Sequence, residues 1–149
     1  MKIKTKITDI THDDIVNLLS TASYGSSWLG LNYDTTDFLS LEDSDKYRCI
    51  EDKMAALLLA GKSVELYDMY AEDDTDFYGK LPHHWDYENE TMDYTVTLKD
   101  ISDGIEKALD KGGWTAKCAM NLINSYGDFD QTEAEELIQW IIFGKSIYG

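Results

Sequence analysis

The sequence predicts an α+β fold in which one helix-rich domain carries a small antiparallel sheet. Residues 63–70 and 91–98 alternate apolar and polar side chains, which is the pattern of half-buried strands. Much of the remaining chain repeats apolar residues at the spacing of amphipathic helices. A chain of 149 residues, 43% of them hydrophobic, is large enough for one core. We therefore expect a single domain over residues 1–149.

The N-terminal part predicts an extended segment and a capped helix. Residues 3–11 alternate in the manner of a short strand or an extended lead-in. Thr11 can cap a helix whose third position is Asp14, and Gly25 is expected to end that helix. Residues 25–38 place Gly and Ser between bulky side chains, which favours an ordered loop or a short irregular strand.

The middle of the chain predicts a central helix followed by two strands. Residues 48–60 form the most apolar helical pattern, which Gly61 stops, so we expect this helix to lie centrally in the core. The strands at 63–70 and 91–98 can pair antiparallel. The segment between them is then a long excursion from that hairpin, and such long loops are often functional.

The C-terminal part predicts three more helices. Thr97 caps the first, which a Gly-Gly pair ends. Residues 114–126 form the next helix, and either Asp130 or Thr132 caps the last one. The residues of these last two helices that we expect in the core are Trp114, Cys118, Leu122, Ile123, Leu137, Ile138, Ile141 and Ile142.

The charge of the chain is its most unusual property. It has 29 acidic residues against 13 basic ones, a net charge of −16 and a pI near 4.3. Such a field repels nucleic acid and anionic membranes and attracts basic partners, although acidity that serves solubility alone is the alternative. We expect no direct nucleic-acid binding. No apolar run approaches the roughly 20 residues that span a bilayer, and no signal peptide is expected, so the predicted location is the cytoplasm.

The sequence contains no metal-binding pattern that we expect to be functional. Cys49 and Cys118 lie apart, each in a helical pattern, and are expected to be buried and reduced. His83 and His84 are adjacent, so on an extended chain they point in opposite directions and do not share an ion.

A calcium loop also fails on inspection. Asp74, Asp76 and Gly79 match the start of an EF-hand-like loop, but Tyr78 and Trp85 occupy positions where oxygen ligands are required. No catalytic motif is present either, so we expect no catalytic, cofactor-binding or metal-binding residues and interpret the chain as a non-enzyme. A catalytic pair among the many carboxylates stays open, because separation in space is invisible in the sequence.

The acidic segment at residues 72–93 is the expected interaction surface. It holds eight carboxylates and one lysine. Trp85, with Tyr78 and Tyr87 among carboxylates, has the composition of an interface centre inside an anionic rim. The predicted partner-binding residues are Glu72, Asp73, Asp74, Asp76, Tyr78, Trp85, Asp86, Tyr87, Glu88 and Glu90, and a second candidate surface comprises Asp128, Asp130, Glu133 and Glu136.

Three blocks of the sequence suggest a family. They are "ITDITHDDIVNLLSTASYG" near the start, "YTVTLKDISDGIEKAL" in the middle and "AEELIQWIIFGKSIYG" at the end, about half of the chain. Together they resemble a family of small acidic proteins from phages and prophages of Gram-positive bacteria. The resemblance implies a shared fold and a phage origin, and it transfers no functional residue. With a phage origin, the expected cytoplasm is that of the host cell.

A phage origin bears on the function that we expect. Small acidic phage proteins often resemble anti-CRISPR and anti-restriction inhibitors, which occupy nucleic-acid-binding grooves. We therefore expect an inhibitor of a host nucleic-acid-directed defence system, a monomer or small homo-oligomer that binds a basic surface such as that of a host nuclease. The alternatives are an adaptor with no defence role and a small-molecule binder or enzyme with a site between sheet and helices.

Overall fold

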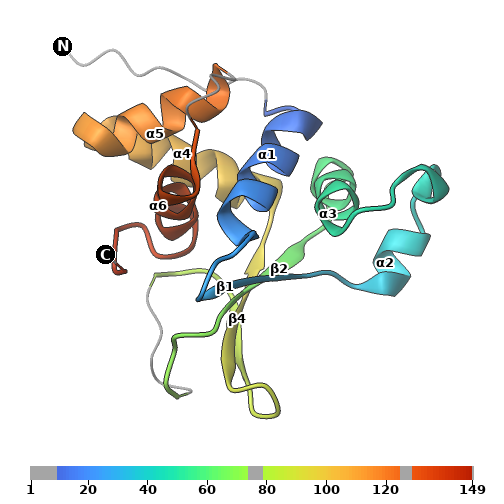
Figure 1. Cartoon of the computed structure of the whole chain (residues 1–149). Coiled ribbons are helices and arrows are strands. Elements are labelled where there is room, and N and C mark those ends of the chain that lie inside the picture. The colour runs from blue at the N-terminus through green and yellow to red at the C-terminus, as the bar shows by residue number, and fades with distance from the viewer. Residues whose placement is uncertain (1–9, 74–78, 125–128, 149) are drawn as a thin grey trace.

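The computed structural model describes residues 10–73, 79–124 and 129–148. These residues form a helix-rich α+β fold with a small antiparallel sheet, which confirms the predicted fold class (Figure 1). In chain order the elements are α1 (His12–Ser23), β1 (Leu29–Asn32), α2 (Thr35–Leu39), a 3₁₀ turn (Ser44–Lys46), α3 (Ile50–Leu59), β2 (Val64–Asp68), β3 (His83–Asp86), β4 (Thr91–Val96), α4 (Leu98–Lys111), α5 (Gly113–Ile123) and α6 (Gln131–Ile142).

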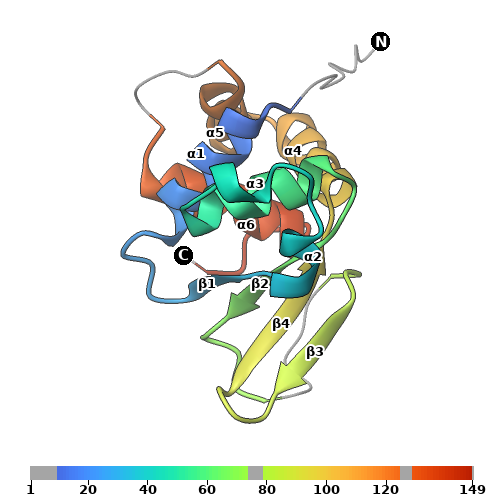
Figure 2. The same ribbon diagram turned by 90° about the vertical axis from the view of Figure 1, so that its right-hand side faces the viewer.

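The sheet has the order β1-β2-β4-β3, and each neighbouring pair is antiparallel. The predicted pairing of the strands at 63–70 and 91–98 is confirmed, since β2 and β4 lie side by side at its centre. The segment between them is not a simple excursion, because it contains β3, which pairs with the outer side of β4. The β3–β4 hairpin projects away from the helices (Figures 1 and 2).

Alternation along the central strands places one face of the sheet in the core. Val64 and Leu66 of β2, and Met92, Tyr94 and Val96 of β4, are at most 2% exposed. Helix α6 packs against α1, α4 and α5, and its Leu137, Ile138, Ile141 and Ile142 are buried as predicted.

Local hydrogen bonding fixes where three of the helices begin. Thr11 and Thr97 form the capping boxes that the sequence predicts for α1 and α4, with Asp14 and Asp100 as the reciprocal partners. Of the two candidates for α6, Asp130 is the cap, and its box is completed by Glu133.

Helix α4 contains a glycine at its closest approach to α6. Gly104 is buried, and a Cβ atom built there would lie 2.5 Å from the Cα of Ile141. That separation is far below van der Waals contact, so the two helices can approach this closely only because residue 104 has no side chain.

The end of the described chain is held against the sheet by polar contacts. The Gln139 side-chain carbonyl accepts hydrogen bonds from the backbone N–H groups of Ile147 and Tyr148, both at 2.7 Å. The Tyr148 hydroxyl donates to Asp68 at the end of β2. Trp28 and Phe143 pack their rings near Tyr148, so the tail closes an aromatic cluster beside β1 and β2.

Several sequence-based predictions are wrong in detail. A short strand was one of the two expectations for residues 25–38, and it is present as β1, but helix α2, whose N-cap is Asp34, begins in the same stretch and was not predicted. Trp114, in the first turn of α5, is 50% exposed and Ile123, at the end of the helix, is 38% exposed, although Cys118 and Leu122 between them are buried. Cys49 is exposed at the start of α3, whereas Cys118 is buried as predicted.

The strand-like pattern at residues 3–11 falls, up to residue 9, outside the described residues. Within the part of the chain that the structure describes, no helix combines the length and the apolar character needed to cross a bilayer.

Candidate functional site on the open face of the sheet

The sheet face opposite the core is the candidate site, and we call it the open face. Directly opposed residues of antiparallel strands lie on the same face, so the strand register defines its rows. One row crosses all four strands and consists of Gly30, Tyr67, Asp93 and His84. The next row consists of Asn32, Glu65 and Thr95.

The open face contains two adjoining hollows. The larger, of about 540 Å³, is lined by Leu31, Asn32, Tyr67, Met69, Asp86, Asn89, Glu90, Thr91 and Asp93. The smaller, of about 320 Å³, is lined by Asn32, Tyr33, Asp34, Asp37, Ser63, Val64, Glu65 and Thr95. Asn32 belongs to both linings, so the hollows form one continuous surface across the sheet.

The linings of both hollows are anionic. Six carboxylates contribute to them, namely Asp34, Asp37, Glu65, Asp86, Glu90 and Asp93, and none of the described lining residues is Lys or Arg. Carboxylates gathered in a concave surface focus a negative potential. The open face therefore attracts cations, whether metal ions or basic side chains.

Tyr67 forms part of the floor of the larger hollow, and Gly30 makes its position possible. A Cβ atom at residue 30 would lie 1.9 Å from the Tyr67 ring, so the ring lies directly on the β1 backbone. With Met69, this ring gives the hollow an apolar part beside its carboxylates.

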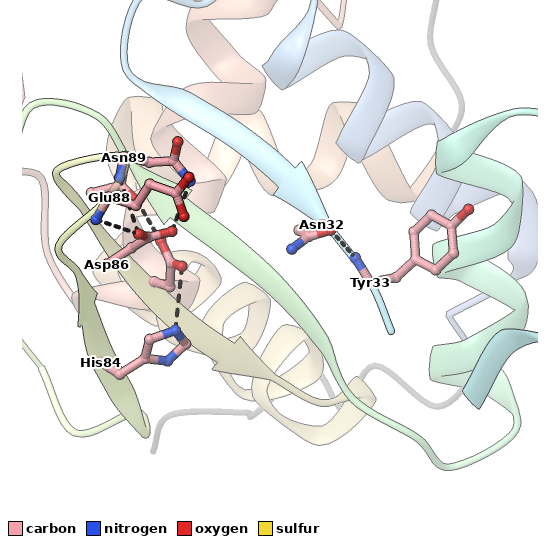
Figure 3. Close-up of polar contacts among 8 residues, drawn as sticks. Asn32, Tyr33, His84, Asp86, Glu88 and Asn89 are labelled. Atoms are coloured by element: carbon pink, nitrogen blue, oxygen red, sulfur yellow. Dashed lines mark hydrogen bonds and ion pairs between the residues drawn. The ribbon is translucent and has the colours of Figure 1, made fainter. Parts of the chain in front are cut away.

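The tip of the β3–β4 hairpin is built around Asp86. Its carboxylate accepts hydrogen bonds from the backbone N–H groups of Glu88 and Asn89, each at 3.0 Å, and from the Asn89 side chain at 2.8 Å (Figure 3). The bonds from Asn89, above all that from its backbone N–H, lower the pKa of Asp86 below its usual value. Glu90 completes the turn with a φ of 55°. The role of Asp86 is thus to shape the turn.

A cluster of three titratable side chains crosses the open face next to this turn. Nε2 of His84 lies 3.4 Å from Oδ2 of Asp93, and Oδ1 of Asp93 accepts a 2.6 Å hydrogen bond from the Thr91 hydroxyl. Ligand atoms of Glu65, His84 and Asp93 all lie within 4.8 Å of one another. Asp93 is only 7% exposed, whereas His84 is exposed at the rim, where Figure 3 shows it below Asp86 on β3.

The structure separates the predicted partner-binding residues into groups. Glu72, Asp73, Tyr87, Glu88 and Glu90 are exposed as an interface would require. Asp74, Asp76 and Tyr78 lie outside the described residues.

Trp85 does not lie in a loop as the sequence suggested. It belongs to β3, is half-buried and packs against the core on the face opposite His84, because it opposes Met92 in the strand register. An exposed anchor at this position is therefore excluded. Among the described residues of this segment, Tyr87, 76% exposed at the tip of the hairpin, is an aromatic side chain that a partner can reach.

The second predicted acidic surface is wrong for its two glutamates. Glu133 is buried and accepts from the Asn121 side chain, and Glu136 is buried and accepts from the Thr115 hydroxyl. Both carboxylates belong to the α5–α6 interface. Asp130 caps α6, and Asp128 lies outside the described residues.

The sequence alone does not show that Asn32, Glu65, Tyr67 and His84 are parts of one surface. Alternation along β2 places Glu65 and Tyr67 on the polar face, but the positions of β1 and β3 in the sheet depend on pairing that no local pattern reveals. No protein-family model, curated protein or solved structure matches the chain. The candidate site is therefore defined by the geometry and charge of its own residues.

Proposed function

We propose that the protein binds a basic surface of a partner protein through the open face and the tip of the β3–β4 hairpin. It acts by stoichiometric binding and without catalysis. The partner that fits best is a host nucleic-acid-directed defence protein, and the role is that of a phage-encoded inhibitor of the anti-CRISPR or anti-restriction type.

The observation that carries this proposal is the charge of the open face. Six carboxylates line its hollows, and the described lining residues include no Lys or Arg. A partner that brings arginines or lysines to this surface meets complementary charge, which steers the encounter and suppresses acidic competitors. The net charge of −16 extends the same field over the molecule.

The shape of the surface supports binding to a groove. The hairpin projects from the helices and carries Tyr87, Glu88 and Glu90 exposed at its tip (Figure 2). A projecting element can enter a concave site, where an aromatic side chain with an apolar body and a polar end is an effective anchor.

A nucleic-acid-binding groove is the concave basic surface that best matches these features. Carboxylates spaced along a strand and a turn can take the places of phosphates against arginine and lysine side chains. The resemblance to acidic phage proteins that we infer from three sequence blocks favours the same partner class. An adaptor that binds a basic protein without a defence role uses the same surface, so the identity of the partner separates the two functions.

Two matched variants test the surface. Glu88→Gln with Glu90→Gln removes two charges from the hairpin tip, while Asp86 is kept because it shapes the turn. Glu106→Gln with Asp110→Asn removes two charges from α4, at the other end of the molecule (Figures 1 and 2). Glu88, Glu90 and Asp110 are exposed and Glu106 is partly exposed. Acids at the surface contribute little to folding, so both variants should unfold at the same urea concentration as the parent.

The partner is first captured from a lysate of a Gram-positive host and identified by mass spectrometry, and association rates are then measured by surface plasmon resonance. We expect a nucleic-acid-binding defence protein whose binding to its nucleic acid is lost at a 1:1 ratio of the acidic protein. The hairpin variant should associate several-fold more slowly at low salt, with the difference shrinking at high salt, whereas the α4 variant behaves as the parent.

Two results count against the proposal. A partner that binds no nucleic acid contradicts the inhibitor role and favours the adaptor. Equal slowing by both variants shows that net charge alone, and not the hairpin, is responsible for binding.

A further inference from the structure

We propose that Glu65, His84 and Asp93 form a binding site for one divalent transition-metal ion, with Zn²⁺ as the best match. The three residues lie on β2, β3 and β4, and their ligand atoms converge on the open face within 4.8 Å of one another. This inference does not rest on the proposed function, although Glu65 and Asp93 also belong to the anionic lining of the open face.

The separation of His84 and Asp93 fits two ligands of one ion better than a direct hydrogen bond. Their Nε2 and Oδ2 atoms are 3.4 Å apart, beyond the range of about 2.7–3.2 Å for a good N–H···O bond. Two ligands at about 2.1 Å from a tetrahedral Zn²⁺ lie about 3.4 Å from each other. The observed spacing is thus that of two corners of such a tetrahedron.

The donor types select the class of ion. An imidazole nitrogen favours Zn²⁺ and neighbouring first-row metals, and the two carboxylates are compatible with them. Ca²⁺ and Mg²⁺ prefer sites built from oxygen alone and from more ligands than these. Three protein ligands leave a fourth position open to water, as in zinc sites that bind a further ligand.

The surroundings hold these ligands in place. The Thr91 hydroxyl donates to Oδ1 of Asp93, which turns Oδ2 toward His84 and orients the carboxylate as an outer-shell partner would. Asp93 is 7% exposed. Among the described residues, the basic side chain that it contacts is His84, and not a Lys or Arg. A buried carboxylate without a permanent cation gains from a bound divalent ion.

The strand register explains why adjacent histidines do not weaken this arrangement. His83 and His84 point to opposite faces of β3, as the sequence predicts, so only His84 belongs to the open face. Asp93 directly opposes His84 across the β3–β4 pair, and Glu65 reaches the pair diagonally from β2. The ion therefore bridges three neighbouring strands.

The test is isothermal titration calorimetry, in which Zn²⁺ is added to the untagged, metal-free full chain. The titration is carried out with Zn²⁺ alone and is then repeated in the presence of excess Ca²⁺. The variants are His84→Gln and Glu65→Gln, and the matched control is His83→Gln, which removes a histidine one position away on the other face. Circular dichroism checks that each variant is folded, and Co²⁺ absorption reports the coordination geometry.

We expect one Zn²⁺ per chain that Ca²⁺ does not displace, with affinity at least about tenfold weaker in both ligand variants and unchanged in His83→Gln. The visible absorption of tetrahedral Co²⁺ should appear in the parent and disappear in His84→Gln. The proposal is overturned if Zn²⁺ binds without defined stoichiometry, if His84→Gln binds as the parent does, or if His83→Gln weakens binding equally.

Discussion

At the scale of single residues, the two cysteines illustrate how burial decides chemistry. Cys49 is exposed at the start of α3, and Cys118 is buried in α5. Burial, with the nearby Glu133 and Glu136 carboxylates acting in the same direction, raises the pKa of the Cys118 thiol to about 12. Cys118 is therefore an unreactive part of the core, because the thiolate is the reactive form.

The raised pKa of the Cys118 thiol predicts that the free energy of unfolding depends on pH. Its pKa is 9.0 in the unfolded reference and about 12 in the fold, so between these values the unfolded chain releases the proton and the folded chain keeps it. The contribution of this thiol to stability is fully present below pH 9.0 and is lost as the pH rises toward 12. The thiol contributes up to about 1.4 kcal/mol of loss per pH unit.

Urea unfolding curves from pH 8 to 11 measure this effect. Tyrosines and lysines titrate in the same range, so the comparison is between the parent and Cys118→Ala. We expect the parent to lose stability with pH more steeply than the variant. Parallel curves would show that the thiol has no part in the pH dependence.

At the scale of the elements, the sequence predicts what short-range chemistry determines. The starts of α1 and α4 are confirmed because a Thr and an Asp three residues apart satisfy the first backbone N–H groups wherever they occur. β3 was missed because four residues at the edge of the sheet, with exposed and half-buried side chains, contain too little hydrophobic alternation to indicate a strand. The exposure of Trp114 was missed because an apolar helix pattern does not reveal which part of the helix's length a neighbour covers.

The close contact between α4 and α6 predicts that adding a methyl group at residue 104 changes the free energy of unfolding. Gly104→Ala would gain up to about 1 kcal/mol in helix propensity if residue 104 were exposed. Its Cβ would, however, lie 2.5 Å from the Ile141 Cα, and backbone atoms cannot rotate away. We expect a net loss of about 1–3 kcal/mol in the free energy of unfolding.

Urea denaturation measures that loss, and Lys107→Ala is the control because Lys107 is exposed on the same helix. The control should change stability by less than about 0.5 kcal/mol. A Gly104→Ala variant more stable than the parent would mean that α4 and α6 are farther apart than described.

At the scale of the whole molecule, charge and topology together make the candidate site. The acidity of residues 72–93 was visible in the sequence, and part of that segment is exposed on the hairpin. The meeting of Glu65, His84 and Asp93 was not visible, because it depends on β3 pairing with β4 and β4 with β2. Contacts between strands follow from register, which is a property of the assembled sheet.

The same overall charge predicts how the protein behaves toward nucleic acid. With a net charge of −16, the chain has no surplus of cations to release counterions from a duplex. We expect no saturable binding in fluorescence anisotropy with a labelled DNA duplex at about 20 mM salt, where electrostatic attraction is least screened. Binding that saturates and weakens as salt is added would contradict this.

The one-sided construction of the sheet also has an evolutionary consequence. The helices pack on the core face, so exposed side chains such as those of Asn32 and His84 on the open face are not needed to fill the interior. Substitutions at such positions are tolerated by the fold more readily than substitutions in the core. When the partner protein changes during evolution, residues of the open face can therefore be substituted one at a time while the core and the fold stay the same.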